Sequence, residues 1–139
     1  MAQTRFNGPV RSDNGFIGGH QLTSANAINV TGDATAAQVA DGYITSTSAA
    51  PVTITLPTGT ALGTAIGASR GTVLDLFIDN TAGADVVTVA VNTNAILSSA
   101  AADTAGSFGD LTIAAGATGL ARYTIMFSSA TAYVFTRTA

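Results

Sequence analysis

Aspartate and arginine are the residues of this sequence best suited to acid, base or ligand chemistry. The chain has 139 residues, and its eight acidic side chains are all Asp and its five basic side chains all Arg. Asp75 and Asp79 stand four residues apart in an alternating segment, which places both on one strand face at a separation of about 13 Å. A glycosidase pair spans at most about 9.5 Å. The spacing therefore does not predict glycoside hydrolysis.

Other catalytic and ligand-binding patterns are also missing from the sequence. His20 is the single histidine, there is no cysteine, and no Gly-x-Ser-x-Gly segment presents a serine. The segment "DNTAGAD" (79–85) lacks the spacing of an EF-hand, and "GTALGTAIGASRG" (59–71) lacks the lysine of a P-loop. We therefore predict a protein that is not an enzyme and that has no metal and no cofactor.

The composition limits the kinds of partner. Only 9% of the residues are charged and the net charge is −3, whereas nucleic-acid binding needs clustered cationic side chains. Apolar runs such as "VVTVAV" (86–91) are far shorter than the roughly 18 residues that favour a membrane-spanning helix. We expect neither nucleic acid nor membrane as a partner. A surface with so few charges favours self-association, so we expect a homo-oligomer.

Alternating apolar and polar residues predict strands that could position these side chains. The expected strands lie at 43–48, 51–57, 71–80, 86–92, 110–116, 121–129 and 131–138. We expect hairpins between 71–80 and 86–92 and between the last two strands. Val87, Val89 and Val91 should share one inward face. The prediction is an all-β fold, either a β-sandwich or a jelly roll.

Two segments between the strands favour short helices. "GDATAAQVADG" (32–42) predicts a helical turn with Asp33 as its N-cap, and Leu62 with Ile66 suggests another within 58–71. The remaining long connection, 93–110, is expected to be a loop that is functional or contacts a partner.

The first 30 residues differ from the rest. "RFNGPVRSDNGFIGG" (5–19) combines arginines, phenylalanines and Asn-Gly turn signals without sustained alternation. We predict an extended docking arm at 1–30 and a β-sandwich domain at 31–139. The arm residues expected to contact a partner are Arg5, Phe6, Arg11, Asn14 and Phe16.

A second candidate contact surface lies on the strand expected at 71–80. Phe77 shares a face with Asp75 and Asp79, although an aromatic side chain at a strand position usually fills a core. Phe108 is the one aromatic residue of the long loop. We predict that these four residues lie at an oligomer or partner interface.

The strand punctuation resembles a recurrent β-domain of tailed-phage virion proteins. Residues 51–139 carry the layout "VTITLP…G…GTVLDLFIDNTAGADVVTVAV…LTIAAGATGLARYTIMFSSATAYVFTR". That family commonly closes with a "D-G-x-x-W" hairpin, where this chain has "SSATAYVF". The leader "RFNGPVRSDNGF" is similar in style to small structural proteins of marine phages.

The resemblance implies a homotrimer on the virion: a capsid decoration (cement) protein, a head fibre or a fibre tip. The length of 139 residues leaves no room for a fibre shaft, so we expect a decoration protein that docks on the major capsid protein at the capsid surface. The alternative is a receptor- or carbohydrate-binding module of a phage fibre or head spike. An ice-binding protein, suggested by the Thr-x-Thr pairs, is a third and weaker hypothesis.

Overall fold

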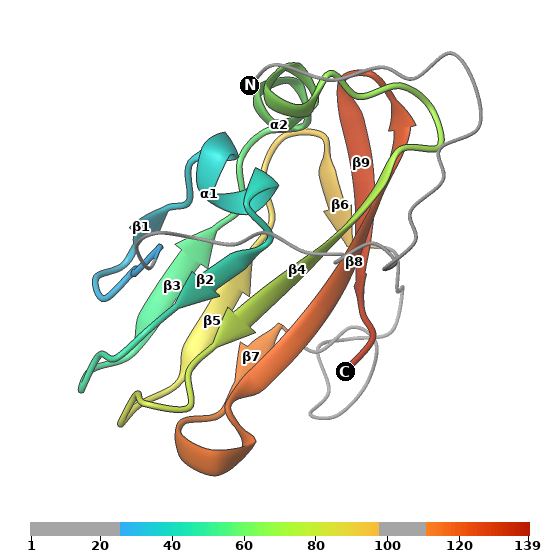
Figure 1. The fold of residues 1–139 in the computed structure, drawn as a ribbon. Coiled ribbons are helices and arrows are strands. Elements are labelled where there is room, and N and C mark those ends of the chain that lie inside the picture. Colours follow the sequence, from blue (N-terminus) through green and yellow to red (C-terminus); the bar gives the residue numbers. More distant parts are fainter. Residues whose placement is uncertain (1–25, 98–110) are drawn as a thin grey trace, which may run out of the picture.

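Strands dominate the described part of the chain. The computed structural model describes residues 26–97 and 111–139, which form nine strands, two α-helices and one 3-10 turn (Figure 1). In chain order these are β1 (Gly32–Asp33), α1 (Ala36–Ala40), β2 (Tyr43–Thr45), β3 (Val52–Thr55), α2 (Gly59–Ile66), β4 (Val73–Asp79), β5 (Val87–Ala90), β6 (Ala95–Leu97), β7 (Thr112–Ile113), the 3-10 turn (Gly116–Thr118), β8 (Leu120–Ser129) and β9 (Ala132–Arg137). The prediction of a largely β fold is confirmed.

The strands form two mixed sheets. One has four strands in the order β1-β3-β5-β7, and the other has five in the order β2-β4-β8-β9-β6. From β1 to β8, consecutive strands alternate between the two sheets. Strands two apart in the chain, such as β1 with β3, β2 with β4 and β3 with β5, therefore lie side by side and run parallel.

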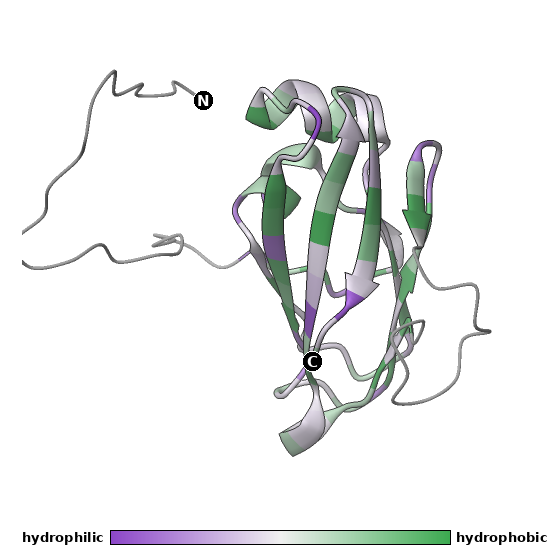
Figure 2. Ribbon diagram, turned by 90° about the vertical axis from the view of Figure 1, so that its right-hand side faces the viewer, coloured by the Kyte–Doolittle hydropathy of each residue, from purple (hydrophilic) through white to green (hydrophobic). Residues whose placement is uncertain are grey.

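Both sheets contribute to one hydrophobic core. Val52, Ile54 and Val89 come from the four-stranded sheet, and Leu76 and Ile125 from the five-stranded sheet; all five are buried in the same cluster. Hydrophobic and pale bands alternate along the long strands in Figure 2, as strands with one buried face require. The burial of alternate apolar side chains is the main stabilising contribution of these strands.

The expected hairpin between 71–80 and 86–92 is wrong. β4 pairs with β2 and β8, whereas β5 pairs with β3 and β7 in the other sheet. The connection between them is fixed by Asn80, which is fully buried. Its side-chain nitrogen donates to the backbone oxygens of Asp85 (2.9 Å) and Ala114 (3.1 Å), and its backbone N–H donates to the oxygen of Gly119 (2.7 Å). These bonds tie the turn to the segment before β8, so the chain crosses to the other sheet.

The expected helical turn exists, but its N-cap is wrong. Thr35 caps α1, because its hydroxyl accepts from the Gln38 backbone N–H and the Gln38 side chain accepts from the Thr35 backbone N–H. This reciprocal capping box satisfies two helix-end donors that Asp33 cannot reach. Asp33 instead lies in β1, where it pairs with Thr55.

Helix α2 confirms the turn predicted from Leu62 and Ile66 and extends over eight residues. Thr58 caps its start and Gly67, with a φ of 63°, ends it in the left-handed region. Gly59 and Gly63 face the turn between β8 and β9, and a Cβ on Gly63 would overlap the backbone oxygen of Ala130. The two glycines therefore allow the helix to pack directly on that turn.

The hairpin of the last two strands is confirmed. β8 and β9 pair antiparallel around the turn at 130–131. The Tyr133 ring packs against Phe127 and Phe135 at centroid distances of 5.4 and 6.4 Å. The Tyr133 hydroxyl donates to the backbone oxygen of Pro57 at 2.7 Å, and burial raises the pKa of this phenol above its ordinary value.

Three segments differ in detail from the predicted pattern. Val91 is 49% exposed because β5 ends at Ala90, so the predicted inward triad is only a pair. The connection expected as a loop at 93–110 contains β6 at its start, and its residues 98–110 lie outside the described residues. Within the expected arm, Ala27 bridges Thr45 and Ile28 packs against the core.

Candidate interaction surface on the five-stranded sheet

The outer face of the five-stranded sheet is defined by residues that alternate with the core. On β4 the side chains of Val73, Asp75, Phe77 and Asp79 point away from the buried Leu76 and Ile78. On β8 the outward residues are Leu120, Arg122, Thr124 and Met126. Val134 of β9 and Ile96 of β6 complete the outer face. Each of these positions follows from the two-residue period of a strand.

An apolar row crosses four strands of this face in register. Val73 lies opposite Met126, Met126 lies opposite Val134, and Val134 lies opposite Ile96. Directly opposite side chains in a sheet are about 5 Å apart at Cβ, so the four side chains form a continuous strip. Val73, Met126 and Ile96 are 56%, 46% and 55% exposed. None of the described residues therefore covers the strip.

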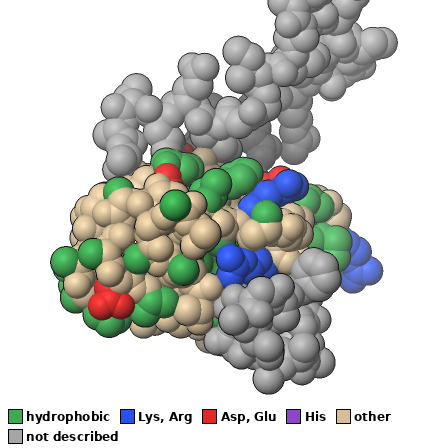
Figure 3. Space-filling view, turned by 90° about the horizontal axis from the view of Figure 1, so that it is seen from below, with side chains coloured by type: hydrophobic (Ala, Val, Ile, Leu, Met, Phe, Trp, Pro, Cys, Tyr) green, Lys and Arg blue, Asp and Glu red, His purple; other side chains and the backbone are tan. Residues whose placement is uncertain are grey.

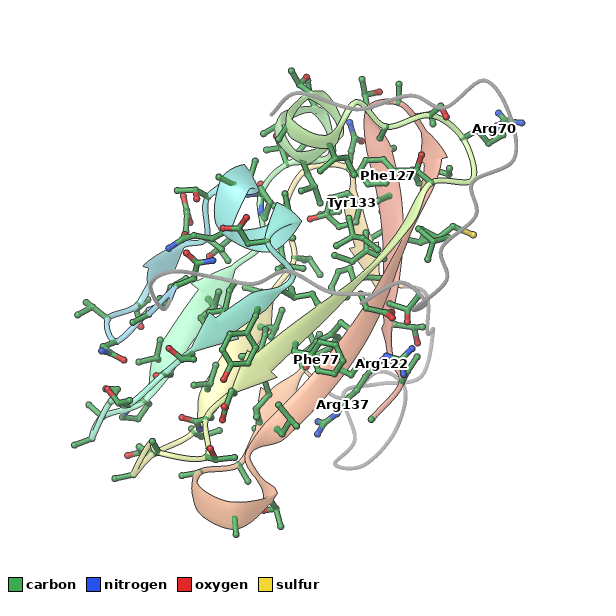
Figure 4. The ribbon with its side chains drawn as sticks, viewed as in Figure 1. Arg70, Phe77, Arg122, Phe127, Tyr133 and Arg137 are labelled. Carbon is green, nitrogen blue, oxygen red and sulfur yellow. The ribbon has the colours of Figure 1, made fainter. Side chains whose placement is uncertain are left out.

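Three polar side chains, those of Asp75, Arg122 and Thr124, lie beside this apolar row. Arg122 donates to a carboxylate oxygen of Asp75 at 3.0 Å, and the Thr124 hydroxyl donates to the other oxygen at 2.7 Å. The Arg122 guanidinium also lies 6.0 Å from the centroid of the Phe77 ring, and Figure 4 shows the two side chains next to each other. The charge of Asp75 is thus matched within the face itself.

Asp79 is held by a separate set of donors at the end of β4. Its carboxylate accepts from the Thr81 hydroxyl and backbone N–H and from the Tyr43 hydroxyl, at 2.6, 2.9 and 2.6 Å respectively. The Thr81 hydroxyl, followed by the Tyr43 hydroxyl, lowers the pKa of Asp79 below its ordinary value. The same hydrogen bond raises the pKa of Tyr43. This carboxylate is therefore a structural acceptor that stays charged at neutral pH.

The outer face of the four-stranded sheet has a different character. Thr53, Thr88 and Thr112 lie in register across β3, β5 and β7. Exposed large apolar side chains are instead concentrated on the five-stranded sheet. Of the seven such side chains among the described residues, five belong to this sheet: Val73, Phe77, Ile96, Leu120 and Met126. The apolar contact surface is thus confined to one sheet.

Charged side chains are sparse on the described surface. Viewed from below, the molecule shows isolated arginines and aspartates among hydrophobic and uncharged polar side chains (Figure 3). Arg137 donates to the backbone oxygen of Thr112 at 2.9 Å, and Arg70 donates to that of Ser128 at 3.1 Å. Both side chains are thus held against the backbone of the domain.

The structure brings three of the predicted site residues together. Asp75, Phe77 and Asp79 share the outer face of β4 as expected, and Phe77 is 37% exposed. Phe108 lies outside the described residues, as do the predicted arm residues Arg5, Phe6, Arg11, Asn14 and Phe16.

Sequence reasoning missed the apolar members of this face. Val73 is an even number of residues from Asp75 and Phe77 and so lies on the same strand face, and Met126 stands between the inward residues Ile125 and Phe127. This alternation could have identified Val73 and Met126 as outward-pointing side chains. That these side chains are neighbours could not be predicted from the sequence, because it depends on the pairing of β4 with β8.

Within 26–97 and 111–139, no group of three or more His, Cys, Asp or Glu side chains is placed to hold a metal ion. Asp75 and Asp79 each accept hydrogen bonds from neighbouring side chains.

A search of the helices in the same residue ranges found none long and apolar enough to cross a membrane.

Comparisons of the chain with protein-family models, with curated proteins and with solved structures found no match.

Proposed function

We propose that this protein is a viral capsid decoration protein that binds an assembled capsid shell as a homo-oligomer and stabilises it. The observation that carries the proposal is the outer face of the five-stranded sheet, where exposed apolar side chains surround an internally paired Asp75–Arg122 contact. Contiguous exposed apolar surface of this kind is typical of proteins that act by association. The resemblance to phage virion β-domains supplies the identity of the proposed partner, the major capsid protein.

The finer fold assignment belongs to the same proposal. We infer a β-sandwich, because buried side chains of both sheets form one cluster and two sheets that share a core pack face to face in that class. A jelly roll is the less favoured assignment, since its sheets are antiparallel and this chain has four parallel strand pairs.

The N-terminal residues are proposed to make the contact with the capsid. Arg5 and Arg11 can form bidentate bonds to carboxylates of an acidic shell, and Phe6 and Phe16 can fill apolar pockets. The turn-forming Asn14 would let the segment follow the shell surface. The domain would then present its sheets to neighbouring molecules while the first residues hold it to the shell.

A co-sedimentation assay with assembled capsid shells tests the proposal. The full chain should pellet with the shells, and a variant lacking residues 1–20 should stay in the supernatant. Circular dichroism should show that the variant keeps its strands, because the described elements start at Gly32.

Two results would overturn this proposal. Equal retention of the full chain and the shortened variant would remove the role of the N-terminal residues. Binding of the full chain to glycans but not to shells, with the glycan binding lost in Phe108→Ala, would indicate a receptor-binding module instead.

A further inference from the structure

We infer that the outer face of the five-stranded sheet is the surface through which copies of this chain associate. The inference rests on the homo-oligomer of the proposed function and deepens it by naming the interface. It does not depend on capsid binding, and its tests use the isolated protein.

The apolar row provides the driving force for association. Val73, Met126, Val134 and Ile96 form an in-register strip, and Leu120, which is 50% exposed, adds apolar surface at the other end of β8. Burial of exposed apolar area is the dominant favourable contribution in most protein association. Methionine adapts its shape to a facing surface, and Met126 lies within the strip, between Val73 and Val134.

The charges of the face do not oppose such burial. Asp75 is paired with Arg122 at 3.0 Å, and Asp79 accepts hydrogen bonds from Tyr43 and Thr81. A second copy would therefore cover one ion pair, Asp75 with Arg122, which avoids the large cost of burying an unpaired charge there. Asp79 has neutral donors only, but it is the last residue of β4 and can stay in contact with water at the rim. The face also offers both signs of charge, Asp75 and Arg122, so a second copy can present the complementary sign.

The dimensions of the face are suitable for a small specific interface. The five strands of this sheet contain 29 residues, and each residue covers about 3.3 Å along its strand and about 4.8 Å across the sheet. The projected area is thus roughly 460 Å² on each copy, or roughly 920 Å² for two copies face to face, close to the ~1,000 Å² that a specific interface should clear. Accessible area exceeds projected area, so the face is large enough.

A second copy fits the strip better than this chain's own N-terminal residues do. Asn26 and Ala27 lie along the β2 edge, whereas the strip runs from β4 to β6 on the other four strands. Residues 1–25 also lack the sustained alternation of apolar and polar residues that would give a strand one apolar face. In another copy, β4 and β8 have this alternation, and their outward side chains contribute to the strip.

Sedimentation velocity of the full chain tests the inference with a matched pair of variants. Met126→Asp places a charge in the strip, whereas Val91→Asp places the same charge at a position of similar exposure beyond the end of β5. The wild type and Val91→Asp should form the same oligomer, and Met126→Asp should associate at least tenfold more weakly. A monomeric wild type at 100 µM would overturn the inference, as would equal association of all three proteins.

Oxidation of Met126 provides a second test that needs no variant. Hydrogen peroxide should oxidise Met126 in dilute protein at a rate comparable to added N-acetylmethionine, because the side chain is 46% exposed in the single chain. The rate should fall several-fold as the protein concentration rises and the strip is covered by another copy. Protection that is equal at all concentrations would indicate cover by the same chain and would overturn the inference.

These tests separate the two proposals. Normal capsid retention by a protein that does not associate through the strip would contradict only the interface. Association through the strip without capsid retention would contradict only the decoration role.

Discussion

At the scale of single residues, Asn80 fixes the path of the chain between the two sheets. Its side-chain nitrogen donates to the backbone oxygens of Asp85 and Ala114 and also lies 3.4 Å from that of Ile113. Its side-chain oxygen, packed over Gly83, accepts no hydrogen bond among the described residues. Asn80 is thus essential as a donor rather than as an acceptor.

Replacing Asn80 should destabilise the protein strongly. Asn80→Ala removes a fully buried side chain and leaves the carbonyls of Asp85, Ile113 and Ala114 without this donor, so it should lower the free energy of unfolding by about 2–4 kcal/mol. Asn80→Asp should lower it further at pH 7, because a carboxylate would face the same carbonyls. Urea denaturation measures both changes. Asn92→Ala removes a hydrogen bond to the Leu56 oxygen and one from the Thr93 backbone N–H at a partly exposed site, and should cost about 1–2 kcal/mol. Equal losses for Asn80→Ala and Asn92→Ala would contradict this role.

The hydrogen bonds of Asp79 should give the stability a pH dependence. They lower its pKa from the ordinary value of 3.8, so its contribution is fully present above that value and is lost as pH falls through the lower pKa of the folded state. Asp79→Asn should therefore be less stable than the wild type at pH 7, and the difference should shrink below about pH 4. Denaturation curves from pH 2 to 7 measure it, and a difference that does not vary with pH would refute the assignment.

At the scale of elements, the contact of α2 with the β8–β9 turn depends on a glycine. A Cβ on Gly63 would overlap the Ala130 backbone oxygen and approach Phe127. Gly63→Ala should therefore lower the free energy of unfolding by about 1–3 kcal/mol through overpacking, although alanine favours helix by about 1 kcal/mol. Thr64→Ala, at an exposed position of the same helix, is the control and should leave the melting temperature within a few degrees. A higher melting temperature for Gly63→Ala would show that this contact is not tight.

The elements also show what could and could not be predicted from the sequence. Alternation correctly located β3, β4, β8 and β9 and the inward direction of Val87 and Val89, because the strand period is local. It could not assign the partner of β4. A hairpin and a crossing to the other sheet bury the same alternate side chains, and the choice depends on the long-range bonds of Asn80 to Ala114 and Gly119.

For the candidate site, too, the positions within one strand could be predicted and the pairing between strands could not. Asp75, Phe77 and Asp79 could be placed on one face because they belong to one strand. The neighbours of Phe77 across the sheet, Tyr43 and Arg122, are 34 and 45 residues away in the chain and depend on strand register. The alternation within one strand therefore predicted which of its residues face outward, but it did not predict which residues of other strands lie beside them.

At the scale of the whole molecule, the two sheets have different outer faces and would serve different purposes. The four-stranded sheet shows a row of threonines and the five-stranded sheet an apolar strip. In the proposed assembly the threonine face meets solvent, the apolar strip meets another copy, and the N-terminal residues meet the shell. The low charge of the chain, 9% of its residues, suits a protein that works in contact with others of its kind.

Cryo-electron microscopy of assembled capsid shells, incubated with the full chain and compared with untreated shells, tests the decoration role most directly. The proposal predicts added density of the size of this domain at symmetry-related positions on the outer surface. The five-stranded sheets should face one another between neighbouring copies. Shells that look the same with and without the protein, while the protein stays folded and oligomeric in solution, would contradict it.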